Sequence, residues 1–292
     1  MEKTKVFVVI LFLVSVNGFS QKIKFSLSYD IISIGKVKYI KLLCIIPRDI
    51  ENTQKVTQIT YSIQPKRVFV KKGYSYAEFL ILNPEVITQI NIDVSMKLYQ
   101  KDFSYVRKSK FRTKETILGF LKKEKYIDSN KKNIKEKAAE LKSTDTLTTL
   151  QNIYYFVKQH IKYKYHSYSI GANKALKTKT GDCTEYSDLF VALCRASNIP
   201  ARTVYGYVSI YGKLAKHTWV EVFINKYGWV RFEPTPGNSS NFYVMIQDYI
   251  QLSELRHDPI LKDYNYIYWE YQSELGAKVI LQDNFSLIKQ KD

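Results

Sequence analysis

Apolar and polar residues alternate along much of residues 22 to about 110, which is typical of β-strands with one buried face. Stretches rich in turn-forming residues separate the runs: PRDIENTQ, KKGYS and LNPE. The runs themselves are KIKFSLSYDII, KVKYIKLLCIIP, KVTQITYSIQP, RVFVKKGYSYAEFLIL and ITQINIDVSMKLY. Their short and regular spacing predicts an antiparallel β-sandwich over residues 21–112.

The spacing of apolar residues becomes helical around Thr113. In KKNIKEKAAELK, Ile134, Ala138 and Leu141 recur every three or four positions, so they share one face of a helix. The next segment, TLTTLQNIYYFVKQHIKY, repeats the pattern at Leu147, Leu150, Tyr154, Val157 and Ile161. The STDT stretch between them offers capping side chains, so the sequence predicts two successive helices.

A third helix is predicted within TGDCTEYSDLFVALCRASNIPARTVYGYV, residues 180–208. Asp182 can cap its start, and Pro200 cannot continue it. Its apolar face comprises Tyr186, Leu189, Phe190, Leu193 and Cys194. Cys183 then lies in the first turn, where unpaired amides and the helix dipole favour a thiolate over a thiol. A plain buried cysteine fits the same position, so a nucleophilic role requires a neighbouring base.

Two further strands are predicted in KHTWVEVFINKYGWVRFEPTPG, residues 216–237. Alternation groups the side chains of one face of each strand: His217, Trp219, Glu221 and Phe223 on the first, and Trp229, Arg231 and Glu233 on the second. If His217 lies directly opposite Glu233, the chain must reverse at Asn225, in a polar stretch that suits a turn. That pairing would bring an imidazole and a carboxylate together, although a purely structural histidine would accept the same neighbour.

These two segments together resemble the transglutaminase-like superfamily, whose papain-like core carries a cysteine, a histidine and an acidic residue in this order. The likeness covers about residues 113–240 and rests on GDCTEYSDLFVALCRASNIPAR and HTWVEVFINKYGWVRFEPT. It implies an α+β fold in which the nucleophile helix packs on an antiparallel sheet. It also implies a triad of Cys183, His217 and Glu233, with glutamate where the family usually has aspartate. The preceding sandwich resembles the β-domain of exported bacterial members.

The chemistry that the resemblance implies is acyl transfer through a thioester on Cys183. The backbone amide of Cys183 is expected to donate one hydrogen bond to the oxyanion. Candidates for the second donor are Gln159, Tyr163 and Tyr165, which packing at a helix end would explain equally well. Trp219 and Trp229 either wall the cleft or belong to the core. We expect no cofactor and no metal, because the histidines and cysteines lack ligand spacing and no glycine-rich phosphate loop occurs.

The N-terminal sequence MEKTKVFVVILFLVSVNGFSQK predicts a cleaved signal peptide at residues 1–20. Its apolar run from Val6 to Val16 is too short to span a bilayer, so we expect no transmembrane segment after cleavage and a periplasmic or secreted protein. An uncleaved anchor or a buried strand is the alternative. Cys194 lies too far along the predicted helix to pair with Cys183, and Cys44 lies in a strand, so Cys183 is expected to be a free thiol.

The chain carries a formal net charge of +18, which raises the question of nucleic-acid binding. The basic residues are spread over the whole chain and no nucleic-acid-reading motif occurs, so a solvated basic surface is favoured, compatible with attraction to anionic envelope polymers. The sequence predicts an exported cysteine enzyme that hydrolyses amide or peptide bonds in a peptide or protein. The alternatives are a cross-linking transglutaminase and a catalytically silent envelope binding module. Residues 241–292 are expected to pack on the catalytic core.

Overall fold

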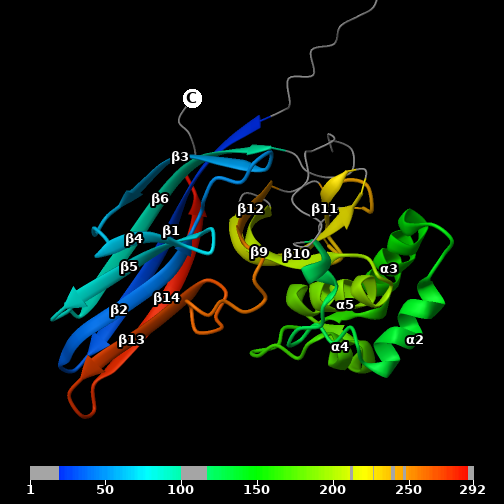
Figure 1. Cartoon of the computed structure of the whole chain (residues 1–292). Coiled ribbons are helices and arrows are strands. Elements are labelled where there is room, and N and C mark those ends of the chain that lie inside the picture. Colours follow the sequence, from blue (N-terminus) through cyan, green and yellow to red (C-terminus); the bar gives the residue numbers. More distant parts are fainter. Residues whose placement is uncertain are drawn as a thin grey trace, which may run out of the picture.

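The computed structural model describes residues 20–99, 117–210, 213–225, 227–237, 241–245 and 248–288. Two units lie side by side in Figure 1, a strand-rich sandwich and a second unit that carries the helices. The predicted α+β class is therefore confirmed. Residues 1–19 of the predicted signal peptide lie outside the described ranges. Within those ranges, no helix combines the length and apolar character needed to cross a membrane.

The N-terminal unit is an antiparallel sandwich of two four-stranded sheets, ordered β14-β1-β6-β3 and β13-β2-β5-β4. Its N-terminal strands are β1 (Ser20–Ile34), β2 (Val37–Ile46), β3 (Gln54–Tyr61), β4 (Arg67–Lys71), β5 (Tyr74–Leu82) and β6 (Ile87–Tyr99). Every second residue of the central strands is buried: Phe25, Leu27, Tyr29 and Ile31 in β1, and Ile90, Ile92, Val94 and Met96 in β6. The two-residue turn between β4 and β5 has φ of 50° at Lys72 and 83° at Gly73, as a type I′ hairpin requires.

The C-terminal part of the chain completes both sheets of the sandwich. Strand β14 (Lys278–Leu287) pairs with β1, and β13 (Ile267–Ser273) pairs with β2. We expected residues 241–292 to pack on the catalytic core, and only β12 (Asp248–Ser253) joins the sheet of that unit. Alternation identifies these segments as strands but carries no information about which sheet edge they extend, since every edge offers the same backbone groups.

The second unit packs helices on the sheet β11-β10-β9-β12. The strands of this sheet that precede β12 are β9 (Ala201–Ile210), β10 (Lys213–Ile224) and β11 (Gly228–Phe232). The helices are η1 (Gly119–Leu121), α2 (Lys132–Leu141), α3 (Thr146–His160), α4 (Ala172–Thr178) and α5 (Cys183–Ala196), and the two-residue strands β7 (Lys162–Tyr163) and β8 (Thr180–Gly181) pair in parallel. Helix α5 lies between the sheet and the other helices (Figure 1), and all its residues from Glu185 to Arg195 are buried.

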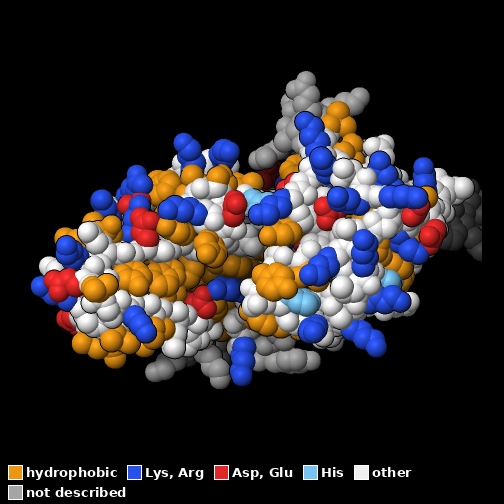
Figure 2. Space-filling model, turned by 90° about the horizontal axis from the view of Figure 1, so that it is seen from below, with side chains coloured by type: hydrophobic (Ala, Val, Ile, Leu, Met, Phe, Trp, Pro, Cys, Tyr) orange, Lys and Arg blue, Asp and Glu red, His pale blue; other side chains and the backbone are white. Residues whose placement is uncertain are grey.

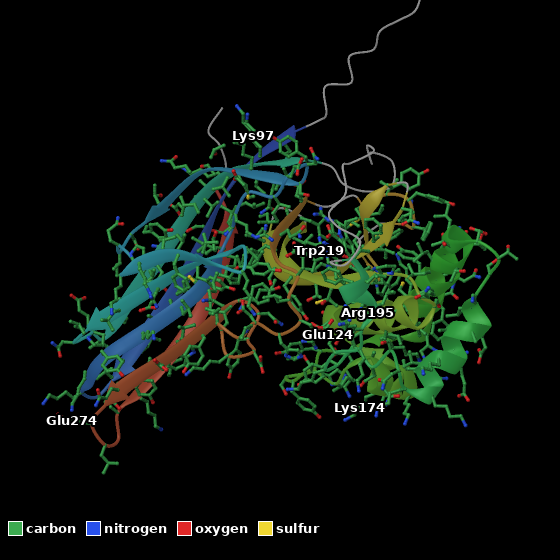
Figure 3. The ribbon with its side chains drawn as sticks, in the orientation of Figure 1. Lys97, Glu124, Lys174, Arg195, Trp219 and Glu274 are labelled. Carbon is green, nitrogen blue, oxygen red and sulfur yellow. The ribbon has the colours of Figure 1, made fainter. Side chains whose placement is uncertain are left out.

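Side chains fix the C-terminal end and the middle of α5. At the C-terminal end, the guanidinium of Arg195 donates to the carbonyls of Ala201 (2.9 Å) and Lys122 (2.7 Å) and pairs with Glu124 at 2.7 Å. Arg195 and Glu124 are labelled side by side in Figure 3. The middle of the helix is held by Asp188, whose two oxygens each accept from Arg256 at 2.9 Å in a buried pair. These contacts tie the helix to segments before and after it in the chain.

The two units meet through polar side chains as well as aromatic ones. Glu254, just after β12, accepts from Arg48 of the sandwich at 3.1 Å and from the Tyr74 hydroxyl at 2.8 Å. The Gln54 side chain hydrogen-bonds the backbone of Gln251 twice, each time at 2.8 Å. A buried hydrogen bond holds its donor and acceptor at one distance and angle, so these contacts fix the orientation of the sandwich relative to the helical unit.

Candidate functional site

Cys183 begins α5 after a tightly built turn. The Asp182 side chain caps the helix by accepting a hydrogen bond from Thr184 N at 2.9 Å. The Glu185 side chain accepts in turn from Asp182 N at 3.2 Å, which completes a capping box. A Cβ at Gly181 would lie 2.3 Å from the Cβ of Glu185, so only glycine permits this approach. The Cys183 amide is at the first helical position, where the helix itself has no acceptor for it.

The strand pair β7–β8 flanks the cysteine. Tyr163 is the parallel partner of Gly181, and Lys164 N donates to the Gly181 carbonyl at 2.8 Å. Tyr163 also interacts electrostatically with Cys183, while 60% of its side chain is exposed. Cys183 itself is half-buried. The nucleophile candidate therefore lies at the surface end of an otherwise buried helix, with an exposed tyrosine beside it.

His217 and Glu233 meet, but not by the predicted register. Ile224 pairs with Gly228 and Val220 with Phe232, so the register differs from the one that would place His217 opposite Glu233. Glu233 follows the last residue of β11 and is displaced by two positions from the point opposite His217. Diagonal neighbours at this offset are still within reach of long side chains. His217 Nε2 and Glu233 Oε2 accordingly lie 2.6 Å apart.

Glu233 is fully buried and accepts three hydrogen bonds. Its Oε1 accepts from Thr235 N at 2.8 Å, and its Oε2 accepts from the Tyr249 hydroxyl at 2.9 Å as well as from His217. The sequence analysis missed Tyr249, which comes from β12 in the segment left without a role. Its alternation in DYIQLS marked it only as a strand residue. With three donors, the carboxylate is held in its ionised form and in one orientation.

The electrostatics of the pair favour an imidazolium beside a carboxylate. Burial disfavours the charged imidazole, but the Glu233 carboxylate and the neighbouring Cys183 outweigh it and raise the pKa of His217 to about 10. Burial also opposes ionisation of Glu233, yet His217 and Thr235 lower the pKa of this carboxyl below its usual value. Since Nε2 faces Glu233, Nδ1 is the ring nitrogen left for Cys183. The three side chains thus form one continuous series.

The two predicted tryptophans lie in different places. Trp219 is fully buried, with its ring stacked 6.4 Å from that of His217, and it lies near the junction of the two units (Figure 3). It therefore packs behind the histidine and walls no opening. Trp229 lies near the hairpin turn at the other end of β11, against Phe223 (5.6 Å) and under the guanidinium of Arg202 (4.2 Å).

The remaining predicted donors are on the surface. Gln159 is exposed on the last turn of α3, and Tyr165 is 74% exposed in the loop after β7. Only Tyr163 of the three is brought beside Cys183. All three cysteines are free thiols, and burial raises the pKa of Cys44 to about 12 and that of Cys194 further still. The described part of the chain holds no group of three or more His, Cys, Asp or Glu side chains suited to a metal ion.

Comparisons with known proteins bear on the family and the fold of the chain. Residues 132–234, which include Cys183, His217 and Glu233, match the model of the transglutaminase-like superfamily. A stretch of 75 residues is 41% identical to the uncharacterized protein YebA of Bacillus subtilis, covering 21% of this chain and only 10% of that protein. The crystal structure of a proposed cysteine protease from Cytophaga hutchinsonii is similar over 94% of both chains, with a TM-score of 0.64 and 15% identity.

A weaker likeness, at a TM-score of 0.44 and 14% identity, links 73% of the chain to 89% of the periplasmic domain of TgpA from Pseudomonas aeruginosa. The family match spans the segment that carries the helix start, the histidine strand and the carboxylate. The shared fold of the Cytophaga hutchinsonii protein extends over the sandwich as well as the helical unit. The helical unit of this chain therefore contains the segment, residues 132–234, that matches the transglutaminase-like superfamily.

Proposed function

We propose that this protein is an exported cysteine enzyme that hydrolyses amide or peptide bonds, with Cys183 as nucleophile, His217 as base and Glu233 as the group that orients the base. The observation that carries the proposal is the series Glu233–His217–Cys183 at the start of α5, with the 2.6 Å contact between His217 and Glu233. A nucleophile, a base and a group that orients the base are the parts that covalent catalysis by a thiol requires.

The reaction can be written with these three side chains. Nδ1 of His217 takes the thiol proton, and the Cys183 sulfur attacks the carbonyl carbon of an amide. The Cys183 amide, without an acceptor in α5, donates to the resulting oxyanion. The imidazolium then protonates the departing amine as the C–N bond breaks, which leaves a thioester. Water, deprotonated by His217, attacks the thioester and releases a carboxylic acid and the free thiol. Glu233 stabilises the imidazolium in both halves of the reaction.

Hydrolysis is favoured over cross-linking by the surroundings of the cysteine. A transferase must keep its thioester from water until an amine arrives, which calls for a closed site. Cys183 is half-buried and its neighbour Tyr163 is 60% exposed, so water has access from this side. The proposed substrate is a peptide or protein outside the cytoplasm, in keeping with the predicted signal peptide. The basic side chains are scattered over the face seen in Figure 2 and gather in no single patch there, so that face does not suggest one charged partner.

Thiol labelling tests the proposed function without a known substrate. Iodoacetamide at pH 6 should alkylate Cys183 faster than the buried Cys44 and Cys194, and His217→Ala should slow the labelling of Cys183 strongly. Uniformly slow labelling of all three thiols would contradict a nucleophilic role and favour a silent binding module.

A second experiment separates hydrolysis from cross-linking. Envelope peptides are screened with the purified protein, and the products from any cleaved peptide are analysed with and without a primary amine at millimolar concentration. We expect the free acid to predominate in both cases. A predominantly amine-coupled product would identify a cross-linking enzyme.

A further inference from the structure

Tyr249 contacts the same carboxylate oxygen as the histidine. Its hydroxyl donates to Oε2 of Glu233 at 2.9 Å, and His217 Nε2 lies 2.6 Å from that oxygen. Tyr249 is 3% exposed and Glu233 is fully buried, so water does not compete for this hydrogen bond. A hydroxyl facing a buried carboxylate stabilises the charged form of the carboxylate.

The position of Tyr249 in the sheet explains why its length matters. It pairs with Val208 of β9, and β9 separates β12 from β10. Val208 in turn pairs with Ala215, so two strand spacings of about 10 Å and an offset of two residues separate the backbones of Tyr249 and His217. The phenol crosses this distance over β9, and its ring packs 5.0 Å from Trp219 and 6.1 Å from His217. These rings fix the direction in which the hydroxyl points.

Glu233 needs such a partner because the sheet does not hold it. It follows Phe232, the last residue of β11, so no ladder pairing restrains its backbone. Its side chain has three rotatable bonds, and the direct contact with His217 is diagonal. Without a second side chain on Oε2, only the Thr235 amide on Oε1 would oppose rotation of the carboxylate away from Nε2.

We propose that Tyr249 is a positioning residue, whose hydroxyl keeps the Glu233 carboxylate ionised and directed at His217 Nε2. The inference rests on the proposed function, since the purpose of this arrangement is to let His217 accept the Cys183 proton. Tyr249 keeps its own proton throughout. It acts on the reaction through Glu233.

Other charged and titratable groups surround the same carboxylate. Tyr154 and Lys158 of α3 interact electrostatically with Glu233, and the Arg231 guanidinium lies 5.5 Å from the centre of the Tyr249 ring. A Tyr249→Phe substitution leaves all of these in place and keeps the ring packing. The change it produces can therefore be assigned to the lost hydroxyl.

The test is the pH dependence of Cys183 alkylation by iodoacetamide, measured from pH 4 to 9 on the full chain. In Tyr249→Phe the carboxylate loses one donor, so it takes up a proton at higher pH and support for the imidazolium is lost earlier on acidification. We expect the acid midpoint of labelling to rise by roughly 0.5 to 1 pH unit, with a plateau rate close to that of the wild type. Tyr271→Phe, an exposed tyrosine of β13, is the matched control and should not move the midpoint.

A second pair of variants separates positioning from general stability. Glu233→Gln removes the titrating carboxyl, so adding Tyr249→Phe to it should cause no further shift of the midpoint. A shift of equal size in both backgrounds would overturn the inference, and so would superimposable profiles of wild type and Tyr249→Phe; either result leaves the proposed function intact. Labelling of wild-type Cys183 no faster than that of Cys44 and Cys194 at every pH would overturn both. Thermal unfolding of each variant verifies that the fold is retained.

Discussion

The two faces of strand β10 are buried by different chemistry. On one face, Val220 and Val222 pack with residues of α5, such as Leu189, in an apolar core. On the other, Glu221 binds Arg202 in a buried pair at 2.6 Å, and Arg202 lies 3.8 Å from Glu254. The comparison shows that the sheet is joined to its helices by apolar packing, whereas on its other face an ion pair links β10 to the neighbouring strand β9.

The two faces should therefore respond differently to mutation and to solvent. Apolar packing is insensitive to pH and strengthened by kosmotropic salts, whereas ion pairs depend on both partners being present and charged. The experiments below use this difference, from the largest expected effect to the smallest.

Truncation on the apolar face should have the largest effect. Phe190→Ala in α5 removes a fully buried ring that stacks on Phe232 at 6.1 Å, and we expect the free energy of unfolding to fall by about 3–5 kcal/mol. Urea unfolding measures it. Leu147→Ala, at a 38% exposed position of α3, serves as control and should change stability by less than about 0.5 kcal/mol. Equal losses at the two positions would contradict the assignment of α5 as the centre of the core.

Breaking the charged face should cost somewhat less. Glu221→Gln leaves the buried Arg202 with only the more distant Glu254, and we expect a loss of about 2–3 kcal/mol. The double variant Arg202→Met with Glu221→Leu should recover most of this loss, because it leaves no unpaired charge. If the double variant is no more stable than Glu221→Gln, the ion pair itself stabilises the fold. The loss in Glu221→Gln would then not come only from leaving Arg202 without its partner. Denaturant unfolding of the three proteins distinguishes the two.

The pH dependence of stability should reveal the His217–Glu233 pair. Because the pKa of His217 is raised to about 10 when folded, its contribution is fully present below the unfolded value of about 6.5 and is lost as pH rises through about 10. We expect the stability difference between wild type and His217→Gln to shrink by about 1–2 kcal/mol between pH 7 and pH 8.5, and further as the pH approaches 10. Thermal unfolding across this range checks it, and a difference that stays constant would contradict the charged state of the imidazole. The same scan on Phe190→Ala should give a constant difference.

The smallest effect is expected where β10 meets the sandwich at the surface. Lys216 pairs there with Asp283 of β14, and both side chains are partly exposed. Asp283→Asn should cost no more than about 1 kcal/mol at low salt and nothing measurable at 1 M salt. Comparing the Tm of the two proteins at both ionic strengths tests this. A loss that persists at high salt would show that the pair is shielded like the buried ones.

The sequence predicted the apolar face of β10 far better than the charged one. The alternation in HTWVEVFI and the helical spacing in α5 are local patterns, and each element lies close in the chain to the element it covers. The charged face brings together Arg48, Arg202 and Glu254. Arg48 precedes the other two by more than 150 residues, so no local period links them. Ion pairs between distant segments leave no signal in a single sequence.

The same distinction applies within the candidate site. The place of Cys183 at a helix start followed from the Asp182 cap, a local signal that the structure shows in full. The meeting of His217 and Glu233 was predicted, but from a register displaced by two positions, because such a shift leaves the alternation of both strands unchanged. Tyr249 could not be found, since its contact with Glu233 depends on the pairing of β12 with β9. Side-chain partners that depend on strand order require the fold itself.

The closure of the sandwich by β13 and β14 has a consequence for how the chain is made. Strand β1 emerges from the ribosome about 250 residues before its partner β14, which at roughly 5–20 residues per second is a delay of about 12–50 s. During that time β1 and β2 each present an edge with unpaired backbone groups to other nascent chains. The helices and most of the sheet of the helical unit lie between these strands in the chain. All of that unit except its edge strand β12 is therefore synthesised well before the sandwich is complete. Biosynthesis of this protein therefore depends on protecting those two edges until the last strands arrive.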